Sequence, residues 1–285
     1  MTLTSIPGIK VGHWDDPEAR TGVTVVDLPE PNIAAAEVRG GAPGSRELAL
    51  LQLGRSVESI QAIVLTGGSA FGLAAADGVV RELEADGRGH PTLVGSVPIV
   101  PAGVIYDLAV GSSDVRPGPE QGAAAYRAAS DAPVTTGRIG AGMGATVAGW
   151  RGQQIPGGIG SFAMEVQGAV VGVLLVANAV GDLFTLEGTP ITGGTHRPEW
   201  PTEPPPIGEN TTLVVVATTA AVDRAGLGRV MIRAHDALGA CIRPSHTRYD
   251  GDMTFAVSTG SDRVSADAVA EAAFVCVGEA IATVG

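Results

Sequence analysis

Apolar and polar residues follow two different periods along this chain, and segments of both kinds alternate through its length. Short β-branched apolar runs that end at Gly, Pro or Asp predict strands. Longer segments with apolar residues every three or four positions predict helices that bury one face. The predicted strands are residues 22–28, 62–66, 146–150, 170–177, 212–218 and 253–258. The predicted helices are residues 45–53, 70–85, 120–129, 222–241 and 264–282, the last with Ser265 as its N-cap. This mixture indicates an α/β or α+β class in which helices cover sheet.

Residues 189–209 break the pattern. They are rich in Gly, Pro and Thr and contain few apolar side chains, which predicts an exposed, partly mobile linker. The linker divides the chain into a large N-terminal portion and a small C-terminal one, and nothing marks either portion as an independent domain. The strand predicted at 212–218 is almost wholly apolar. We therefore expect it to lie inside a sheet that the N-terminal portion completes.

Asn210 and Thr211 stand where the linker ends and this strand begins. If the peptide bond between them is cut, Thr211 gains a free α-amino group beside its own hydroxyl. Base and nucleophile then lie on one residue, as in N-terminal threonine catalysis. Two plainer interpretations stay open: both residues are common at a loop-to-strand junction, and Asn-Thr-Thr fits the glycosylation pattern.

Three further polar residues lie at the ends of apolar runs. Asp250 and Asp252 flank Gly251 just before a predicted strand, and positions i and i+2 of an extended chain project to the same face. Two neighbouring carboxylates hold one proton more tightly, which suits proton exchange near neutral pH. The alternative is an Asp-Gly turn with solvated aspartates. Asn178 ends another apolar run, where its amide either donates to an oxyanion or ties down the following turn.

Two glycine-rich segments and the histidines give weaker signals. Residues 140–145 satisfy G-x-G-x-x-A, but a strand-like run follows where a dinucleotide site needs a helix. Residues 67–72 follow a strand and open a helix, so their N–H groups are suited to an anionic group, and we interpret Ser69 as the N-cap. The five histidines lack ligand spacing. We therefore expect neither a cofactor nor a metal.

Composition narrows the classes of partner. The net charge of −12 and the pI of about 4.8 argue against binding nucleic acid or an anionic membrane, which needs clustered Lys and Arg. Cys241 and Cys276 lie in helical apolar patterns, so we expect two buried thiols rather than a disulfide. No signal-peptide pattern is visible, and the longest apolar run, 170–180, is too short to span a bilayer. We expect a cytoplasmic protein.

Several longer motifs together resemble the DmpA-type aminopeptidases, and they cover almost the whole chain. They lie at residues 11–13, 16–22, 38–47, 65–73, 97–102, 234–236 and 250–252. That family includes β-aminopeptidases, L-aminopeptidase/D-esterases and the nylon-oligomer (6-aminohexanoate-oligomer) hydrolases. The Asn-Thr junction and the paired aspartates are most similar to the nylon-hydrolase branch, because other branches carry Gly-Ser.

The resemblance implies an α+β fold, a four-layer αββα sandwich of the N-terminal-nucleophile-hydrolase type. It also implies self-cleavage of a single domain, residues 1–285, into segments 1–210 and 211–285 that stay together, and homo-oligomers, often tetramers. Position by position, it assigns Thr211 as nucleophile, Asn210 as the residue before the cut, Asn178 as the oxyanion asparagine, and Asp250 and Asp252 as the acidic pair.

The resulting hypothesis is a self-cleaving amide hydrolase with an N-terminal threonine. It would act on small N-terminal residues of peptides or on short β- or ω-amino-acid amides. One alternative is an acyltransferase of the ornithine-acetyltransferase kind, which also generates an N-terminal threonine. The other is an uncut, inactive homologue. The nylon-hydrolase branch looks to have a lysine after the glycine-rich run, where this chain has Gly149, which cannot supply a cation.

Overall fold

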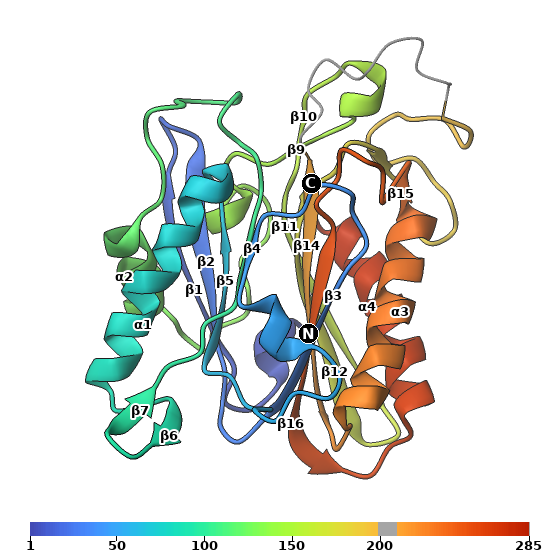
Figure 1. Ribbon diagram of the computed structural model, residues 1–285. Coiled ribbons are helices and arrows are strands. Elements are labelled where there is room, and N and C mark those ends of the chain that lie inside the picture. The colour runs from blue at the N-terminus through green and yellow to red at the C-terminus, as the bar shows by residue number, and fades with distance from the viewer. Residues whose placement is uncertain (199–209, 285) are drawn as a thin grey trace.

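Two five-stranded sheets lie face to face at the centre of the molecule (Figure 1). We describe them in a computed structural model that places residues 1–198 and 210–284. The first sheet has the order β1-β2-β5-β8-β4, with β5 and β8 parallel and the other pairs antiparallel. Its strands are β1 (Lys10–Asp16), β2 (Thr21–Asp27), β4 (Ser45–Arg46), β5 (Ala62–Thr66) and β8 (Ala102–Val104).

The second sheet has the order β11-β12-β14-β16-β3. Only β14 and β16 run parallel in it. Its strands are β3 (Ile33–Val38), β11 (Gly158–Val166), β12 (Ala169–Asn178), β14 (Thr211–Ala220) and β16 (Met253–Asp262). The strand after the linker, β14, thus lies between β12 of the N-terminal portion and β16. This placement confirms that the N-terminal portion completes the sheet around it.

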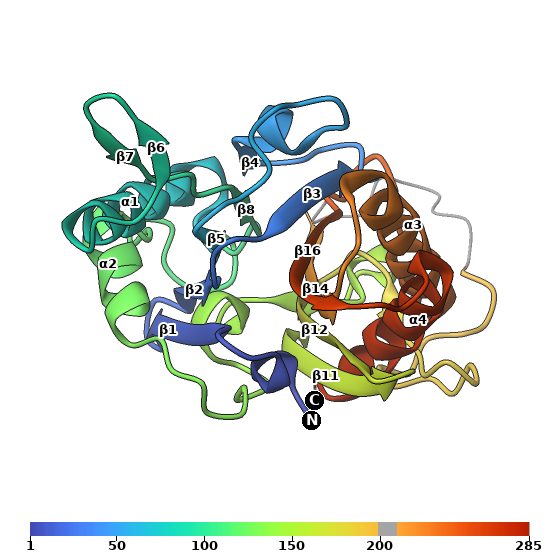
Figure 2. The ribbon, with the colours of Figure 1, turned by 90° about the horizontal axis from the view of Figure 1, so that it is seen from below.

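Helices cover the outer face of each sheet (Figures 1 and 2). α1 (Ala75–Ala85) and α2 (Pro119–Arg127) pack on the first sheet, and α3 (Arg224–Cys241) and α4 (Ala266–Ala282) pack on the second. The four layers confirm the αββα sandwich of the α+β class. Within the described chain, none of the helices combines the length and the apolar character that crossing a membrane requires.

Shorter elements connect these layers. Three small pairs of strands are β6 (His90–Thr92) with β7 (Gly95–Val97), β9 (Thr146–Val147) with β10 (Ile155–Pro156), and β13 (Asp182–Leu183) with β15 (Ile242–Arg243). The 3-10 turns are η1 (Leu3–Ser5), η2 (Leu48–Leu51), η3 (Ser69–Ala74), η4 (Gly140–Gly142) and η5 (Gly149–Arg151).

The second sheet is buried on both faces. Alternate residues of β14 point in opposite directions, so Val215 packs between the sheets while Val214 and Val216 pack under α3 and α4. Nine of the ten residues of β14 are buried. This explains why the sequence shows a continuous apolar run there instead of alternation.

Most of the predicted elements are confirmed. β2, β5, β12, β14 and β16 lie where five strands were predicted, and α1 to α4 lie within one to five residues of four predicted helices. The Ser265 hydroxyl accepts from the Ala268 N–H and caps α4 as predicted. Cys241 and Cys276 are free and buried, as expected.

Two predicted elements are wrong. Residues 45–53 form β4 and the turn η2 instead of a helix, and residues 146–150 contain only the two-residue strand β9. Ala148 has φ +69°, which ends the strand and leads into η5. In the linker, residues 189–198 are mostly exposed, and the remaining residues, 199–209, lie outside the described part of the chain.

Candidate active site

The register of the second sheet places the end of the linker, Asn210 and Thr211, next to polar residues from distant parts of the sequence. Asn178, the last residue of β12, pairs with Thr211, the first residue of β14. Asn210 forms a parallel bridge with Asp250, just before β16 begins. The sequence-predicted residues Asn178, Asn210, Thr211 and Asp250, and with them Asp252, therefore meet at one end of this sheet.

The peptide bond between Asn210 and Thr211 is held on both sides. The Thr211 hydroxyl donates to the Asn210 carbonyl oxygen at 2.7 Å, and the Gly251 N–H donates to the same oxygen at 2.8 Å. The Asn210 N–H in turn donates to the Tyr249 carbonyl at 3.1 Å. Two donors on one carbonyl oxygen draw electron density away from its carbon, which favours attack by a nucleophile there.

Glycine is required between the two aspartates. A Cβ on Gly251 would lie 2.6 Å from the Thr211 hydroxyl oxygen. A Cβ on Gly40 would collide with the backbone of Asp250 and Asp252 from the other side. The loop can approach Thr211 this closely only because both positions lack a side chain.

Asp250 is fully buried. One of its carboxylate oxygens accepts from the Thr247 N–H at 2.8 Å and the Thr247 hydroxyl at 2.7 Å, and the other accepts from the Val180 N–H at 3.3 Å. Burial and then the charge of Asp252 raise the pKa of Asp250 to about 6. This carboxyl is therefore able to exchange a proton close to neutral pH.

Asp252 is fixed by partners that include a histidine which the sequence reasoning did not single out. Its Oδ1 accepts from the Thr212 N–H at 2.7 Å. Its Oδ2 accepts from the backbone N–H of His246 at 3.0 Å and lies 2.8 Å from the His246 Nδ1. The histidines show neither metal-ligand spacing nor a Ser-His-Asp pattern in the sequence, and a His six residues before an Asp carries no further signal. Among the described residues, no three His, Cys, Asp or Glu side chains gather as a metal site would require.

Asn178 has one end of its amide fixed and the other free. Its Oδ1 accepts from the Thr146 N–H at 2.9 Å, which settles the orientation of the amide. Its Nδ2 is buried and has no hydrogen-bond partner within the described chain. An orphan buried donor costs stability. Such a donor next to Thr211 is suited to an oxyanion that forms only during a reaction.

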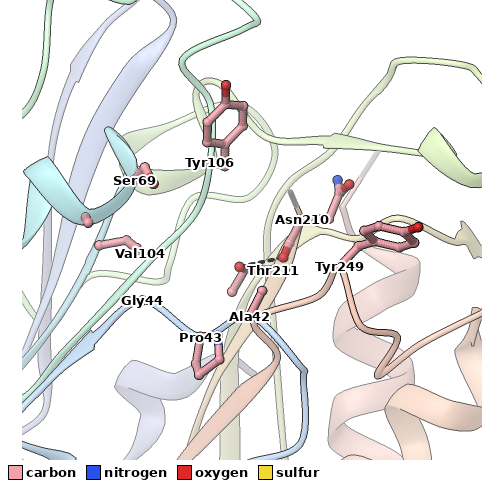
Figure 3. Close-up of a pocket in the computed structure, with 10 residues that line it drawn as sticks. Ala42, Pro43, Gly44, Ser69, Val104, Tyr106, Asn210, Thr211 and Tyr249 are labelled. Atoms are coloured by element: carbon pink, nitrogen blue, oxygen red, sulfur yellow. Dashed lines mark hydrogen bonds between the residues drawn. The ribbon is translucent and has the colours of Figure 1, made fainter. Parts of the chain in front are cut away.

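A cavity of about 240 Å³ opens beside Thr211, between the two sheets (Figure 3). The first sheet contributes β8 and the turn η3 to its lining. The rest of the lining comes from the loop after β3, the start of β14 and the loop before β16. The lining residues are Ala42, Pro43, Gly44, Ser69, Ala70, Val104, Tyr106, Asn210, Thr211 and Tyr249.

Ser69 has a different role from the predicted one. Gly68 occupies the N-cap position of η3, and no side chain caps this turn. Ser69 itself has φ +53° and lines the cavity. The loop is held by Asp107, a buried residue missed in the sequence, whose Oδ1 accepts from the Gly68 N–H at 2.7 Å.

The model of peptidase family S58 matches residues 2–284. The chain belongs to peptidase family S58. Membership confirms the resemblance seen in the motifs and makes the protein a hydrolase of amide bonds.

Named proteins that are similar to this chain agree with this membership. An uncharacterized aminopeptidase of Mycobacterium leprae is 42% identical, over 94% of this chain and 81% of the relative. A 6-aminohexanoate-oligomer endohydrolase of Paenarthrobacter ureafaciens is 29% identical, over 91% of this chain and 75% of the relative. The L-aminopeptidase D-Ala-esterase/amidase of Ochrobactrum anthropi, described as a variant of the Ntn-hydrolase fold, superposes with a TM-score of 0.77. It is 22% identical over 99% of this chain and 85% of that structure, so the likeness shows a shared fold.

Proposed function

We propose that the chain cuts its own backbone between Asn210 and Thr211 and then hydrolyses small amides with Thr211 as nucleophile. One observation carries the proposal. The Thr211 hydroxyl lies 2.7 Å from the carbonyl oxygen of its own preceding peptide bond, and the Gly251 N–H holds that oxygen from a second direction. A nucleophile and an oxyanion donor thus already flank the bond to be cut.

The self-cleavage step conserves the atoms of the peptide. The Thr211 oxygen bonds to the Asn210 carbonyl carbon, the bond from that carbon to the Thr211 nitrogen breaks, and the hydroxyl proton moves to the nitrogen. Water then hydrolyses the ester and leaves a carboxylate on Asn210 and a free amine on Thr211. Residues 1–210 and 211–285 remain one folded unit.

In the cut enzyme the new amine is the base. A free α-amine has a reference pKa of about 7.7–8.0, so it can accept the Thr211 hydroxyl proton as the hydroxyl attacks a substrate carbonyl. The free Nδ2 of Asn178 donates to the resulting oxyanion. Asp250 and Asp252 lie in the loop that pairs with residues 210–213 and orient the amine. The amine then passes the proton to the leaving group, and water resolves the acyl-enzyme.

The cavity limits the substrate to a small group. Its volume of about 240 Å³ lies below the range of about 300–1,000 Å³ typical of sites for drug-sized ligands. Two substrate classes agree with this size and with the names of the relatives: N-terminal residues of peptides, and short ω-amino-acid oligomers. A panel of amino-acid p-nitroanilides and of short β- and ω-amino amides distinguishes these classes.

Two substitutions at the nucleophile test the proposal. Thr211→Ala should remain a single chain on a denaturing gel and hydrolyse no amide, because it lacks the attacking oxygen. Thr211→Ser keeps the oxygen and should still be cut and active. Cleavage of the Thr211→Ala chain at this bond would contradict the proposal, and so would activity in its uncut form.

We also propose that the cut protein assembles into homo-oligomers, expected to be tetramers, in the cytoplasm. Leu93 and Val94 at the tip of the β6–β7 hairpin are almost fully exposed, which is unusual for a monomer surface. The free thiols Cys241 and Cys276 agree with a reducing compartment. Light scattering on the purified protein and fractionation of the source cells measure the two properties.

A further inference from the structure

His246 contacts the acidic pair through both its backbone and its ring. The His246 N–H and Nδ1 both face Asp252 Oδ2, at 3.0 Å and 2.8 Å. His246 has φ +55°, a left-handed conformation that a non-glycine residue adopts at some cost. This conformation directs both the backbone N–H and the ring Nδ1 of His246 toward the same carboxylate oxygen of Asp252.

The ring of His246 is surrounded by acceptors. Nδ1 faces the Asp252 carboxylate, and Nε2 lies 3.4 Å from the backbone carbonyl oxygen of His235. A neutral imidazole has an N–H on only one nitrogen. The lone pair of its other nitrogen would then point at one of these two oxygens, which is unfavourable. The imidazolium, which donates from both nitrogens, is the form that fits both neighbours.

The charged and titratable groups around the ring come from three elements. His235 of α3 packs edge-on against it, with ring centroids 4.9 Å apart, and burial lowers the pKa of His235 to about 4, so that this neighbour is neutral. Glu37 of β3 and Arg39 just after it influence His235, the first through its backbone and the second through its charge. Asp250 and Asp252 face His246 from its own loop.

We propose that His246 is a positioning residue of this reaction: its ring and backbone hold Asp252 fixed against the Thr212 N–H, so that Asp250 is the carboxyl of the pair that gains and loses a proton. The proposal rests on the proposed function, because it assigns different tasks to the two aspartates near Thr211. Asp252 stays fixed, and Asp250 is the carboxyl whose ionisation sets how strongly it attracts the Thr211 amine.

The electrostatics of the pair agree with this division. Burial lowers the pKa of His246, but the hydrogen bond and the charge of Asp252 outweigh burial and raise that pKa above its usual value. The positive charge is therefore present at low pH and is lost only as the pH rises through the raised pKa. The described partners of Asp250 are instead two backbone N–H groups and a hydroxyl, none of which carries a charge.

Two substitutions at one position separate the hydrogen bond from the charge. In His246→Asn the amide nitrogen takes nearly the place of Nδ1 and can still donate to Asp252, and Asn tolerates a positive φ. This variant keeps the bond and loses the charge. His246→Ala loses both, while its backbone N–H still donates to Asp252.

The measurements are the fraction of cut chain and the pH dependence of kcat on a small p-nitroanilide. His246→Asn should be cut and keep most of its kcat, with the acid limb displaced to higher pH by about half a unit to one unit, because removing a nearby cation raises the pKa of Asp250. His246→Ala should lose about tenfold to a hundredfold in kcat, because Asp252 keeps only its two backbone donors and loses the ring that fixes its Oδ2.

A purely structural role predicts different results. If His246→Asn and His246→Ala change the yield or the melting temperature but leave the acid limb and kcat of the cut enzyme unchanged, the proposal is wrong. If His246→Ala cannot be purified, the acid limb of His246→Asn decides alone. The proposed function fails separately, in the wild-type chain, if that chain is active without being cut.

Discussion

At the scale of single residues, two different hydrogen-bond donors lie near Thr211, and only one of them binds a carbonyl group in the described structure. In the uncut chain the Gly251 N–H binds the Asn210 carbonyl oxygen, while the Asn178 Nδ2 has no partner among the residues that the structure describes. Under the proposed function, self-cleavage and the hydrolysis of substrates would therefore draw on different oxyanion donors. This separation allows one reaction to be removed without the other.

Asn178→Ala should still be cut at Asn210–Thr211, because the donor on that carbonyl belongs to the backbone of Gly251. Its kcat on amides should fall by about 10²–10³, the usual effect of removing one oxyanion donor. A denaturing gel and steady-state kinetics measure the two effects. An uncut Asn178→Ala chain, or a kcat close to that of the wild type, would contradict this assignment.

The activity should decline as the pH falls through about 6. The pKa of Asp250 is raised to about 6, so this carboxyl is ionised above that pH and becomes protonated below it. The protonated form no longer attracts the Thr211 amine, and the rate falls. Asp250→Asn should lower kcat at all pH values and abolish this acid limb. A limb that persists unchanged in Asp250→Asn would show that another group titrates.

The polar residues of the site could be found in the sequence because each stands just before or just after an apolar run. Asn178, Thr211 and Asp250 all stand at strand ends, where a polar residue needs an explanation. His246 could not be found this way, because it lies in a loop. Its contact with Asp252 depends on the left-handed backbone conformation at His246, which the sequence does not reveal.

At the scale of the elements, the segment after β3 shows how a tertiary contact overrides a local pattern. The apolar spacing of residues 45–53 predicted a helix, but the Arg224 guanidinium donates to several backbone carbonyls of this neighbourhood. Within residues 45–53 it reaches the Leu50 and Gln52 carbonyls, at 3.5 and 3.3 Å. Its shorter bonds lie on either side of that segment, to Ala34 at 2.9 Å, Arg55 at 3.0 Å and Val57 at 2.8 Å. A carbonyl that binds Arg224 needs no partner from within a helix, so an irregular backbone is stable there.

Arg224→Gln should lower the free energy of unfolding by about 2–3 kcal/mol, because buried carbonyls lose a charged donor. Arg229→Gln, on the exposed side of the same helix, is the matched control and should have almost no effect. Urea unfolding of both variants gives the comparison. Equal stability of the two would mean that Arg224 does not hold this segment.

Other elements were missed for reasons of composition. β3 is rich in Ala and β11 contains Gly158 and Gly160, residues with a weak preference for strands. β1 mixes charged and aromatic residues at the edge of the first sheet. Pairing with neighbours, which local sequence does not reveal, forms all three strands.

At the scale of the whole molecule, the chain order explains how a cut protein can stay together. β14 and β16 of the C-terminal portion are flanked in the sheet by β12 and β3 of the N-terminal portion. The apolar run of β14 was enough to predict this burial. The cavity could not be predicted, because three loops from both sheets meet to form it.

After cleavage, segments 1–210 and 211–285 should elute as one species in size-exclusion chromatography without denaturant. They should separate only in urea or guanidinium, because β14 pairs with β12 along eight residue pairs and is buried on both faces. Elution of the small segment alone under native conditions would contradict this architecture.

The most direct test of the account is the intact mass of the purified wild-type chain, measured under denaturing conditions during prolonged incubation. The account predicts that the 28.6 kDa species gives way to two species. Their masses should correspond to residues 1–210 and 211–285 and together exceed the uncut chain by one water, and amidase activity should rise as they appear. A chain that stays at its full mass while hydrolysing amides at a constant rate would contradict it.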